Sequence, residues 1–340
     1  MTITGSCPIC LEDELVLTPL PCGHAYCAAC LASIAHMSAL ACAMPGCPAA
    51  THQPPDTPDC VPVRALVPLF AQHAPLAHAR GSTVALASAA LVYYHYNTQG
   101  ERDSGWGCAY RCLQMVLSAY VGLHPERSFE LSHLPTIATA VPALIDVMAH
   151  PPSWHQGYAA AAEAYDRTCG NVGDGGRRVP SIWEIQLRLA YDMDTQGRFA
   201  PHDIGSHKWI EPFEIATFAR RYGEHGARFA VEQPHAQRDS LLERLHEHFT
   251  TRRTPIAIDD LVLAYVLAGV CFDHSRSRVY LLRFDPHHRQ PVSYDDFQAA
   301  LAANATTTTT TPAPDGVQGV QWLPYERVFA GKQEWHFCWS

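Results

Sequence analysis

The sequence lacks an excess of positive charge, an apolar run long enough to cross a membrane, and any internal repeat. Lys and Arg total 24 against 33 Asp and Glu, which gives a net charge of −9. This balance argues against a protein that binds nucleic acid by neutralising phosphates. The most apolar window, 256–272, contains Asp259 and Asp260 and is too short for a membrane-spanning helix. We therefore expect no nucleic-acid partner and no membrane span.

The first ten residues also lack the basic segment and apolar core of a secretory signal. We therefore expect a protein of the cytoplasm, with the nucleus as an alternative. Of the 340 residues, 47% are hydrophobic, which is ordinary for a globular protein. This length suits one domain with a small second one, or two domains.

Cysteine, by contrast, is plentiful and clustered. Seven of the 13 cysteines fall within residues 7–47, and in a chain without a secretory signal this clustering indicates metal binding rather than disulfides. Thiolate and imidazole are ligands of zinc. Two cysteines with two residues between them can bind one ion from a tight turn. With one histidine the cluster offers ligands for two tetrahedral zinc ions: Cys7, Cys10, Cys22, His24, Cys27, Cys30, Cys42 and Cys47.

The order of these ligands resembles a RING finger of the C3HC4 type, which we place at residues 1–50. The resemblance implies two interleaved structural zinc sites. The first would be bound by Cys7, Cys10, Cys27 and Cys30, and the second by Cys22, His24, Cys42 and Cys47.

RING fingers bind ubiquitin-conjugating enzymes, and Ile9 matches the apolar contact position of that family. Pro48 stands where active ligases often carry a basic residue. The last two ligands are separated by four residues, as in the first RING of RING-between-RING ligases. The finger is therefore either a ligase module that recruits a conjugating enzyme or a zinc-stabilised docking domain.

The rest of the chain indicates a proline-rich linker with helices over 51–89, then one larger domain over 90–340. Residues 90–96 suggest a strand, and helical periodicity extends across 61–89. Further helices are predicted at 108–123, 180–193, 210–223 and 238–253, and strands at 253–260, 261–273 and 278–284. Helices followed by antiparallel strands are typical of an α+β domain. The low-complexity segment 303–316 is predicted to be a surface loop.

The segment DSGWGCAYRC at 103–112 is the strongest candidate for chemistry. Gly105 and Gly107 permit a tight turn directly before a helix. Cys108 then begins that helix, where unpaired N–H groups and the helix dipole stabilise a thiolate. Cys112 lies one turn later on the apolar face and is expected to be a buried hydrophobe. These positions predict that Cys108 is the nucleophile.

A cysteine nucleophile needs a base, and the base needs a group that orients it. The predicted strand 278–284 is followed by Asp285, Pro286 and His287. Side chains two residues apart on an extended segment point the same way, so Asp285 could hold the imidazole of His287 and fix its tautomer. The alternative is an ordinary strand-end turn with exposed polar side chains.

Together these residues resemble the active site of the ubiquitin-fold-modifier-specific proteases, papain-like cysteine peptidases of family C78. The blocks that carry the likeness occur in the family's order: YYHY at 93–96, DSGWGCAYR at 103–111, VPSIWEIQ at 179–186, IGSHKWIEPFEI at 204–215, LVLAYVLAGV at 261–270, DPH at 285–287 and an aromatic tail at 322–340. The resemblance implies a papain-like cysteine protease domain that follows a small RING-type zinc-binding domain.

The resemblance also implies roles for single residues. Cys108 would be the nucleophile, His287 the base and Asp285 the group that orients it. Tyr96 would donate its hydroxyl to the oxyanion, and Trp106 would line a narrow channel for the glycine-containing tail of the modifier. Zinc would be structural and take no part in catalysis.

The sequence departs from its relatives at several positions, and one of them bears on the identity of the catalytic base. Tyr265 stands in the strand before DPH, where a related zinc-finger deubiquitinase has its catalytic histidine. A tyrosine does not accept a proton in that role, which favours His287. His274 is expected to be exposed, and the threonine run at 306–311 is an insertion.

The sequence therefore predicts a thiol isopeptidase that cleaves the bond at the C-terminal glycine of the ubiquitin-fold modifier. Two alternatives remain open. The first is a deubiquitinase that acts on ubiquitin chains. The second is a RING-type ligase or adaptor that recruits a conjugating enzyme and only binds a modifier through its protease-like domain.

Overall fold

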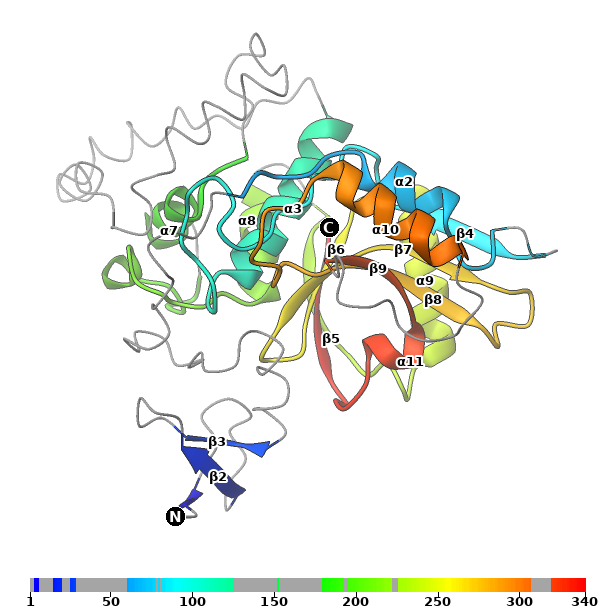
Figure 1. Cartoon of the computed structure of the whole chain (residues 1–340). Helices are drawn as coiled ribbons and strands as arrows, with labels where there is room; N and C mark the ends of the chain where they lie inside the picture. The colour runs from blue at the N-terminus through cyan, green and yellow to red at the C-terminus, as the bar shows by residue number, and fades with distance from the viewer. Residues whose placement is uncertain are drawn as a thin grey trace, which may run out of the picture.

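The computed structural model describes residues 3–5, 15–19, 25–28, 60–77, 79, 81–124, 152, 179–191, 195–221, 226–306 and 319–340. Within these residues the chain forms two antiparallel sheets, the larger of which carries the helices (Figure 1). The smaller sheet lies near the N-terminus. Its strands follow the order β1 (Ile3–Gly5), β2 (Leu15–Pro19) and β3 (Ala25–Cys27).

The larger sheet has seven strands in the order β5-β10-β6-β7-β8-β9, with β4 paired to β7. Their bounds are β4 (Thr83–Leu86), β5 (Arg228–Glu232), β6 (Ile256–Asp259), β7 (Ala264–Phe272), β8 (Val279–Phe284), β9 (Val320–Pro324) and β10 (Trp335–Trp339). One edge of β7 pairs with β8, and the other pairs with β6 and then with β4. All nine residues of β7 are buried, because helices cover the sheet there. This explains its unbroken apolar sequence.

The described helices are α2 (Leu66–Gln72), α3 (Cys108–Leu123), α7 (Ile182–Tyr191), α8 (Pro212–Arg221), α9 (Arg238–Thr251), α10 (Tyr294–Thr306) and α11 (Tyr325–Val328). The central helix is α3, which packs on β6 and β7 and against α7 and α8. Every side chain from residue 108 to 120 is buried, as expected for a helix enclosed on all sides. The domain is therefore α+β, with Cys108 at the start of a buried helix, as the sequence predicts.

The segment predicted to carry helices over 61–89 holds one short helix, α2, and one strand, β4. Both contribute buried side chains to the hydrophobic core of the domain that contains the larger sheet. Strand β4 forms because residues 83–86 pair with β7. Helix α2 lies beside α10 (Figure 1), and the rings of Phe70 and Phe297 are 6.1 Å apart.

Two other predictions were wrong in part. Residues 90–96 form no regular strand, and their one backbone bridge joins Tyr93 to Val63. Residues 303–306, predicted as loop, continue α10, while 307–316 lie outside the described residues. Within the described part of the chain, none of the helices has the length and apolar character that a membrane crossing requires.

Candidate active site

The two glycines before Cys108 shape the turn that leads into α3. Gly105 adopts a φ of +90°, in the left-handed region that favours glycine. A Cβ at Gly107 would collide with the side chain of Asp103. The N–H groups of Trp106 and Gly107 donate to the Asp103 carbonyl at 3.2 and 2.9 Å. This turn places Cys108, only 8% exposed, at the helix N-terminus, where the dipole favours an anion.

The first and last residues of the segment DSGWGCAYR, Asp103 and Arg111, form a buried ion pair. Arg111 donates from Nε and Nη2 to the two carboxylate oxygens of Asp103, at 2.9 and 2.8 Å. Its Nη1 also contacts Glu101 at 3.1 Å, and all three side chains are fully buried. Asp103 further accepts the N–H of Asn97 at 2.8 Å. This network fixes the loop between residues 97 and 107, and the sequence analysis missed it although both ends lie in the motif.

His287 and Asp285 form the predicted pair at the end of β8. The Nδ1 atom of His287 lies 2.5 Å from Oδ1 of Asp285, which also accepts the backbone N–H of His287 at 3.0 Å. Arg283 donates to the other carboxylate oxygen at 3.3 Å. The carboxylate therefore holds the proton on Nδ1 and leaves Nε2 for chemistry. That Nε2 atom is buried, lies near the Cys108 sulfur, and has no nitrogen or oxygen partner among the described residues.

The charges of this pair stabilise each other. Burial alone would lower the pKa of His287, but the Asp285 carboxylate and the neighbouring Cys108 raise the pKa to about 9. Burial would raise the pKa of Asp285, but His287 and Arg283 lower the pKa to about 2. At neutral pH the pair is thus an imidazolium and a carboxylate.

Tyr96 lies beside Cys108 and His287 and is the fourth residue of the predicted catalytic group. It is fully buried, and its hydroxyl has no nitrogen or oxygen partner in the described part of the chain. Burial, followed by the charge of nearby Cys108, raises its pKa well above the usual value, so the phenol keeps its proton. The ring meets the His287 imidazole edge-on, with centroids 5.5 Å apart. A buried donor without a partner beside a nucleophile can serve a ligand oxygen that becomes negative during the reaction.

The segment 93–97 is bound along residues 285–289, and this contact replaces the strand that the sequence predicts. Backbone carbonyls of the second segment accept four bonds, namely Tyr93 Oη to Asp285 at 2.6 Å, Tyr96 N to Pro286 at 2.9 Å, His95 Nδ1 to His288 at 3.1 Å and Asn97 Nδ2 to Arg289 at 3.3 Å. These bonds fix His287 and Tyr96 relative to each other. The sequence offered the YYHY block as a signal, but no chemical role for Tyr93 or His95.

The remaining predicted residues surround this group. Trp106 is 4% exposed and stacks on His207, with ring centroids 4.9 Å apart. The ring of Tyr265 lies 5.3 Å from that of His287. Cys112 is fully buried, and burial raises its pKa well above the usual value. His274 is exposed on the turn after β7, as expected.

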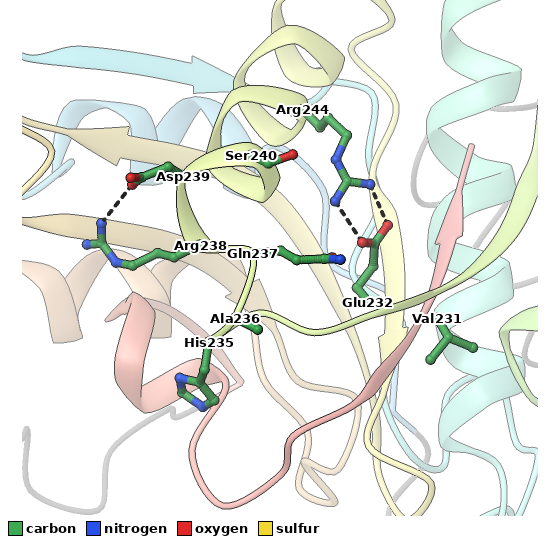
Figure 2. A pocket seen from close by; sticks show the side chains of 9 residues that line it. All are labelled: Val231, Glu232, His235, Ala236, Gln237, Arg238, Asp239, Ser240 and Arg244. Atoms are coloured by element: carbon green, nitrogen blue, oxygen red, sulfur yellow. Dashed lines mark hydrogen bonds and ion pairs between the residues drawn. The ribbon is translucent and has the colours of Figure 1, made fainter.

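A hollow of about 800 Å³ lies elsewhere, at the start of α9 (Figure 2). Two of its arginines pair with carboxylates: Arg244 donates to both oxygens of Glu232 at 2.6 and 2.7 Å, and Arg238 contacts Asp239 at 3.6 Å. The residues that line it include neither Cys108 nor His287. We therefore place the candidate chemistry at the start of α3 and not in this hollow.

Of the eight predicted zinc ligands, Cys27 lies among the described residues, as a buried side chain at the end of β3. The other seven lie outside them: Cys7, Cys10, Cys22, His24, Cys30, Cys42 and Cys47. Among the described residues, no three His, Cys, Asp or Glu side chains gather into a metal site. The donor set itself fits zinc, because thiolates with one imidazole are the ligands of structural zinc sites.

Comparison with known proteins agrees with both parts of this description. Residues 82–308 match the family model of peptidase family C78, and residues 7–44 match a RING-type zinc finger. The "Ufm1-specific protease" of Caenorhabditis elegans is 26% identical over 58% of this chain and 24% of its own length. "Ufm1-specific protease 2" of Rattus norvegicus is 24% identical over 65% of this chain and 36% of its own. The chain thus spans about a quarter to a third of the length of these relatives.

A plant relative and a solved structure complete the comparison. The "Probable Ufm1-specific protease" of Oryza sativa is 28% identical over 61% of this chain and 24% of its own length. The crystal structure of UfSP from C. elegans aligns with a TM-score of 0.44 and 20% identity, over 78% of this chain and 36% of that one. The C78 model covers about two thirds of the sequence. The chain therefore belongs to peptidase family C78 and carries a cysteine-peptidase domain together with a RING-type zinc finger.

Proposed function

We propose that the chain is a thiol peptidase that cleaves the bond after the C-terminal glycine of the ubiquitin-fold modifier, in its precursor, in its conjugates, or in both. The observation that supports this proposal is that two buried polar atoms, Nε2 of His287 and the hydroxyl of Tyr96, lie near the Cys108 sulfur and have no nitrogen or oxygen partner among the described residues. The names of the relatives supply the substrate class.

The first half of the reaction is acylation. The Cys108 thiolate attacks the carbonyl carbon of the terminal glycine, and the carbonyl oxygen becomes negative. The Tyr96 hydroxyl and the backbone N–H of Cys108, unpaired within the first turn of α3, donate to that oxygen. His287 gives its Nε2 proton to the leaving amine, which departs and leaves a thioester on Cys108.

The second half is hydrolysis of that thioester. Nε2 of His287, now without its proton, takes a proton from water while the water oxygen attacks the thioester carbonyl. The tetrahedral oxygen again uses Tyr96, and collapse releases the glycine carboxylate and the Cys108 thiolate. Asp285 remains ionised throughout, because its pKa is held at about 2, and it stabilises the imidazolium in both halves.

The preference for glycine follows from crowding around the sulfur. Cys108, Trp106 and Tyr96 are each at most 8% exposed, so we propose that only residues without a side chain pass through the channel beside Trp106. The modifier tail would then enter as an extended segment whose last residue reaches Cys108.

Cleavage of defined fusions tests this function. The full chain is incubated with the modifier fused through its C-terminal glycine to a reporter, and in parallel with a ubiquitin fusion of the same design. Release of the reporter at the glycine bond of the modifier fusion alone is the expected result. Preferential cleavage of ubiquitin would make the protein a deubiquitinase, and cleavage of neither by the folded protein would favour the adaptor alternative.

For the finger, we propose two structural zinc ions bound in the interleaved pattern, and a docking role. Pull-down with purified ubiquitin-conjugating enzymes tests whether one of them is its partner. Because a catalytic thiolate and zinc thiolates both require reducing surroundings, we propose the cytoplasm or nucleus as the site of action.

A further inference from the structure

Arg289 follows His287 by two residues and carries a charged group that the proposed mechanism does not use. Its Nε and Nη2 atoms are buried and have no hydrogen-bond partner among the residues that the structure describes. Burial also lowers the pKa of its guanidinium. Unpaired buried donors on a charged group are costly, so a reason for their position is needed.

The backbone fixes where the Arg289 side chain begins. Its carbonyl accepts bonds from Nδ2 of Asn97 at 3.3 Å and from Sγ of Cys60 at 3.7 Å. From there the guanidinium extends over the ring of Tyr96, with Cζ 5.8 Å from the ring centroid. A cation at this distance is attracted to the face of an aromatic ring. The positive charge of Arg289 therefore lies over the ring of Tyr96, whose hydroxyl lies near the Cys108 sulfur.

This placement changes the electrostatics of the phenol. Burial and the negative charges of Cys108 and Asp103 raise the pKa of Tyr96, and Arg289 opposes them. A more acidic phenol is a stronger hydrogen-bond donor. A fixed cation also gains most when the bonded oxygen becomes negative, which happens in the tetrahedral intermediate.

We propose that Arg289 is a positioning residue that acts through Tyr96, by holding the phenol ring and by strengthening its hydroxyl as a donor to the oxyanion. The inference rests on the proposed peptidase function, because it requires an oxyanion. It adds to that function a residue whose contribution disappears when the Tyr96 hydroxyl is removed.

A double-mutant cycle on the full chain tests this coupling, with the modifier reporter fusion as substrate. Arg289→Met should lower kcat about tenfold with little change in KM, and Arg289→Lys should retain most of the activity. In a Tyr96→Phe background, Arg289→Met should cost less than about twofold, because its target is already absent. Arg276→Met is the matched control, since Cζ of Arg276 lies 5.9 Å from the Phe272 ring, away from the site; it should leave kcat unchanged.

A second readout separates this role from damage to the nucleophile. Alkylation of Cys108 by iodoacetamide forms no oxyanion, so Arg289→Met should alkylate at the wild-type rate. An equal loss of kcat in both backgrounds, or slower alkylation, would overturn the inference. If Arg289→Met does not fold, Arg289→Gln takes its place in the cycle. Absence of turnover in the wild-type protein would instead overturn the proposed function.

Discussion

The catalytic corner at the start of α3, formed by Cys108, Tyr96 and His287, and the hollow at the start of α9 have similar parts but place their unpaired polar atoms differently. Both combine a helix N-terminus with arginine and carboxylate side chains. In the hollow, Arg244 pairs with both oxygens of Glu232 (Figure 2). In the corner, the Tyr96 hydroxyl and Nε2 of His287 are buried, have no nitrogen or oxygen partner among the described residues, and lie near the Cys108 sulfur.

This difference separates a site from a surface depression. Buried polar atoms without partners cost free energy, and those that lie beside a nucleophile are candidates to bind a reacting group. In the hollow, Nε of Arg244 is also buried without a partner among the described residues, but no cysteine lines the hollow. The catalytic corner is almost closed to solvent, and the Tyr96 hydroxyl and Nε2 of His287 both lie near the Cys108 sulfur.

The largest expected effect comes from removing the sulfur. Cys108→Ala should reduce cleavage of the modifier fusion to background, because no other group can form the thioester. Cys112→Ala is the matched control one helical turn later, and it should retain turnover. Reporter release by both variants, measured side by side, decides the assignment; activity that survives in Cys108→Ala and is lost in Cys112→Ala would exchange the two roles.

The next effect comes from the base. His287→Gln should lower kcat about 10²- to 10⁴-fold, the usual contribution of a positioned acid–base group. His274→Gln alters an exposed histidine on the turn after β7 and should leave the steady-state rate unchanged. A large loss in His274→Gln with an active His287→Gln would transfer the base to His274.

A third effect concerns the stability of the corner. Arg111→Met leaves Asp103 and Glu101 buried without their cation, so the free energy of unfolding should fall by roughly 3–5 kcal/mol. Urea denaturation followed by circular dichroism measures the change. A loss below about 1 kcal/mol, the range of surface pairs, would show that the network does not hold the loop.

A fourth effect concerns pH. The imidazolium of His287 is lost as the pH rises through about 9, so kcat/KM should fall on the alkaline side near that value. Asp285→Asn removes the charge that raises this pKa, and the alkaline limb should move to lower pH. A limb that stays in place in the variant would show that Asp285 does not set the charge of His287.

The smallest effect should occur in the hollow. Arg238→Met removes a partly exposed side chain whose closest carboxylates are 3.5 and 3.6 Å away. We expect kcat to change by less than about twofold and the free energy of unfolding by less than about 1 kcal/mol. A strong loss of turnover in a well-folded Arg238→Met protein would make the hollow part of the functional site.

Local patterns predicted the elements that carry the chemistry. The glycine pair and the apolar period placed the start of α3 at Cys108, and the apolar runs before Asp285 placed β7 and β8. The contacts that assemble the site were less visible, because they join distant segments. Residues 93–97 bind residues 285–289, and only the family resemblance suggested a role for Tyr96.

The sequence analysis mispredicted residues 90–96 and overlooked two arginines, because the contacts of these residues depend on the folded structure. Residues 90–96 are rich in apolar and aromatic side chains, as a strand often is, but Tyr93 and His95 pair with carbonyls nearly 200 residues away. Asp103 and Arg111 looked like ordinary polar residues of a motif, because burial was required to reveal their ion pair. Arg289 gave no sequence signal, since its role depends on the ring it covers.

The most direct test of the central claim is covalent capture of the full chain by the ubiquitin-fold modifier with an electrophile in place of its terminal carboxylate, and by a matching ubiquitin probe. Peptide mapping then identifies the attached residue. The account predicts one adduct, with the modifier probe, on Cys108, and none in Cys108→Ala. An adduct on another cysteine, or labelling by ubiquitin in preference to the modifier, would contradict it.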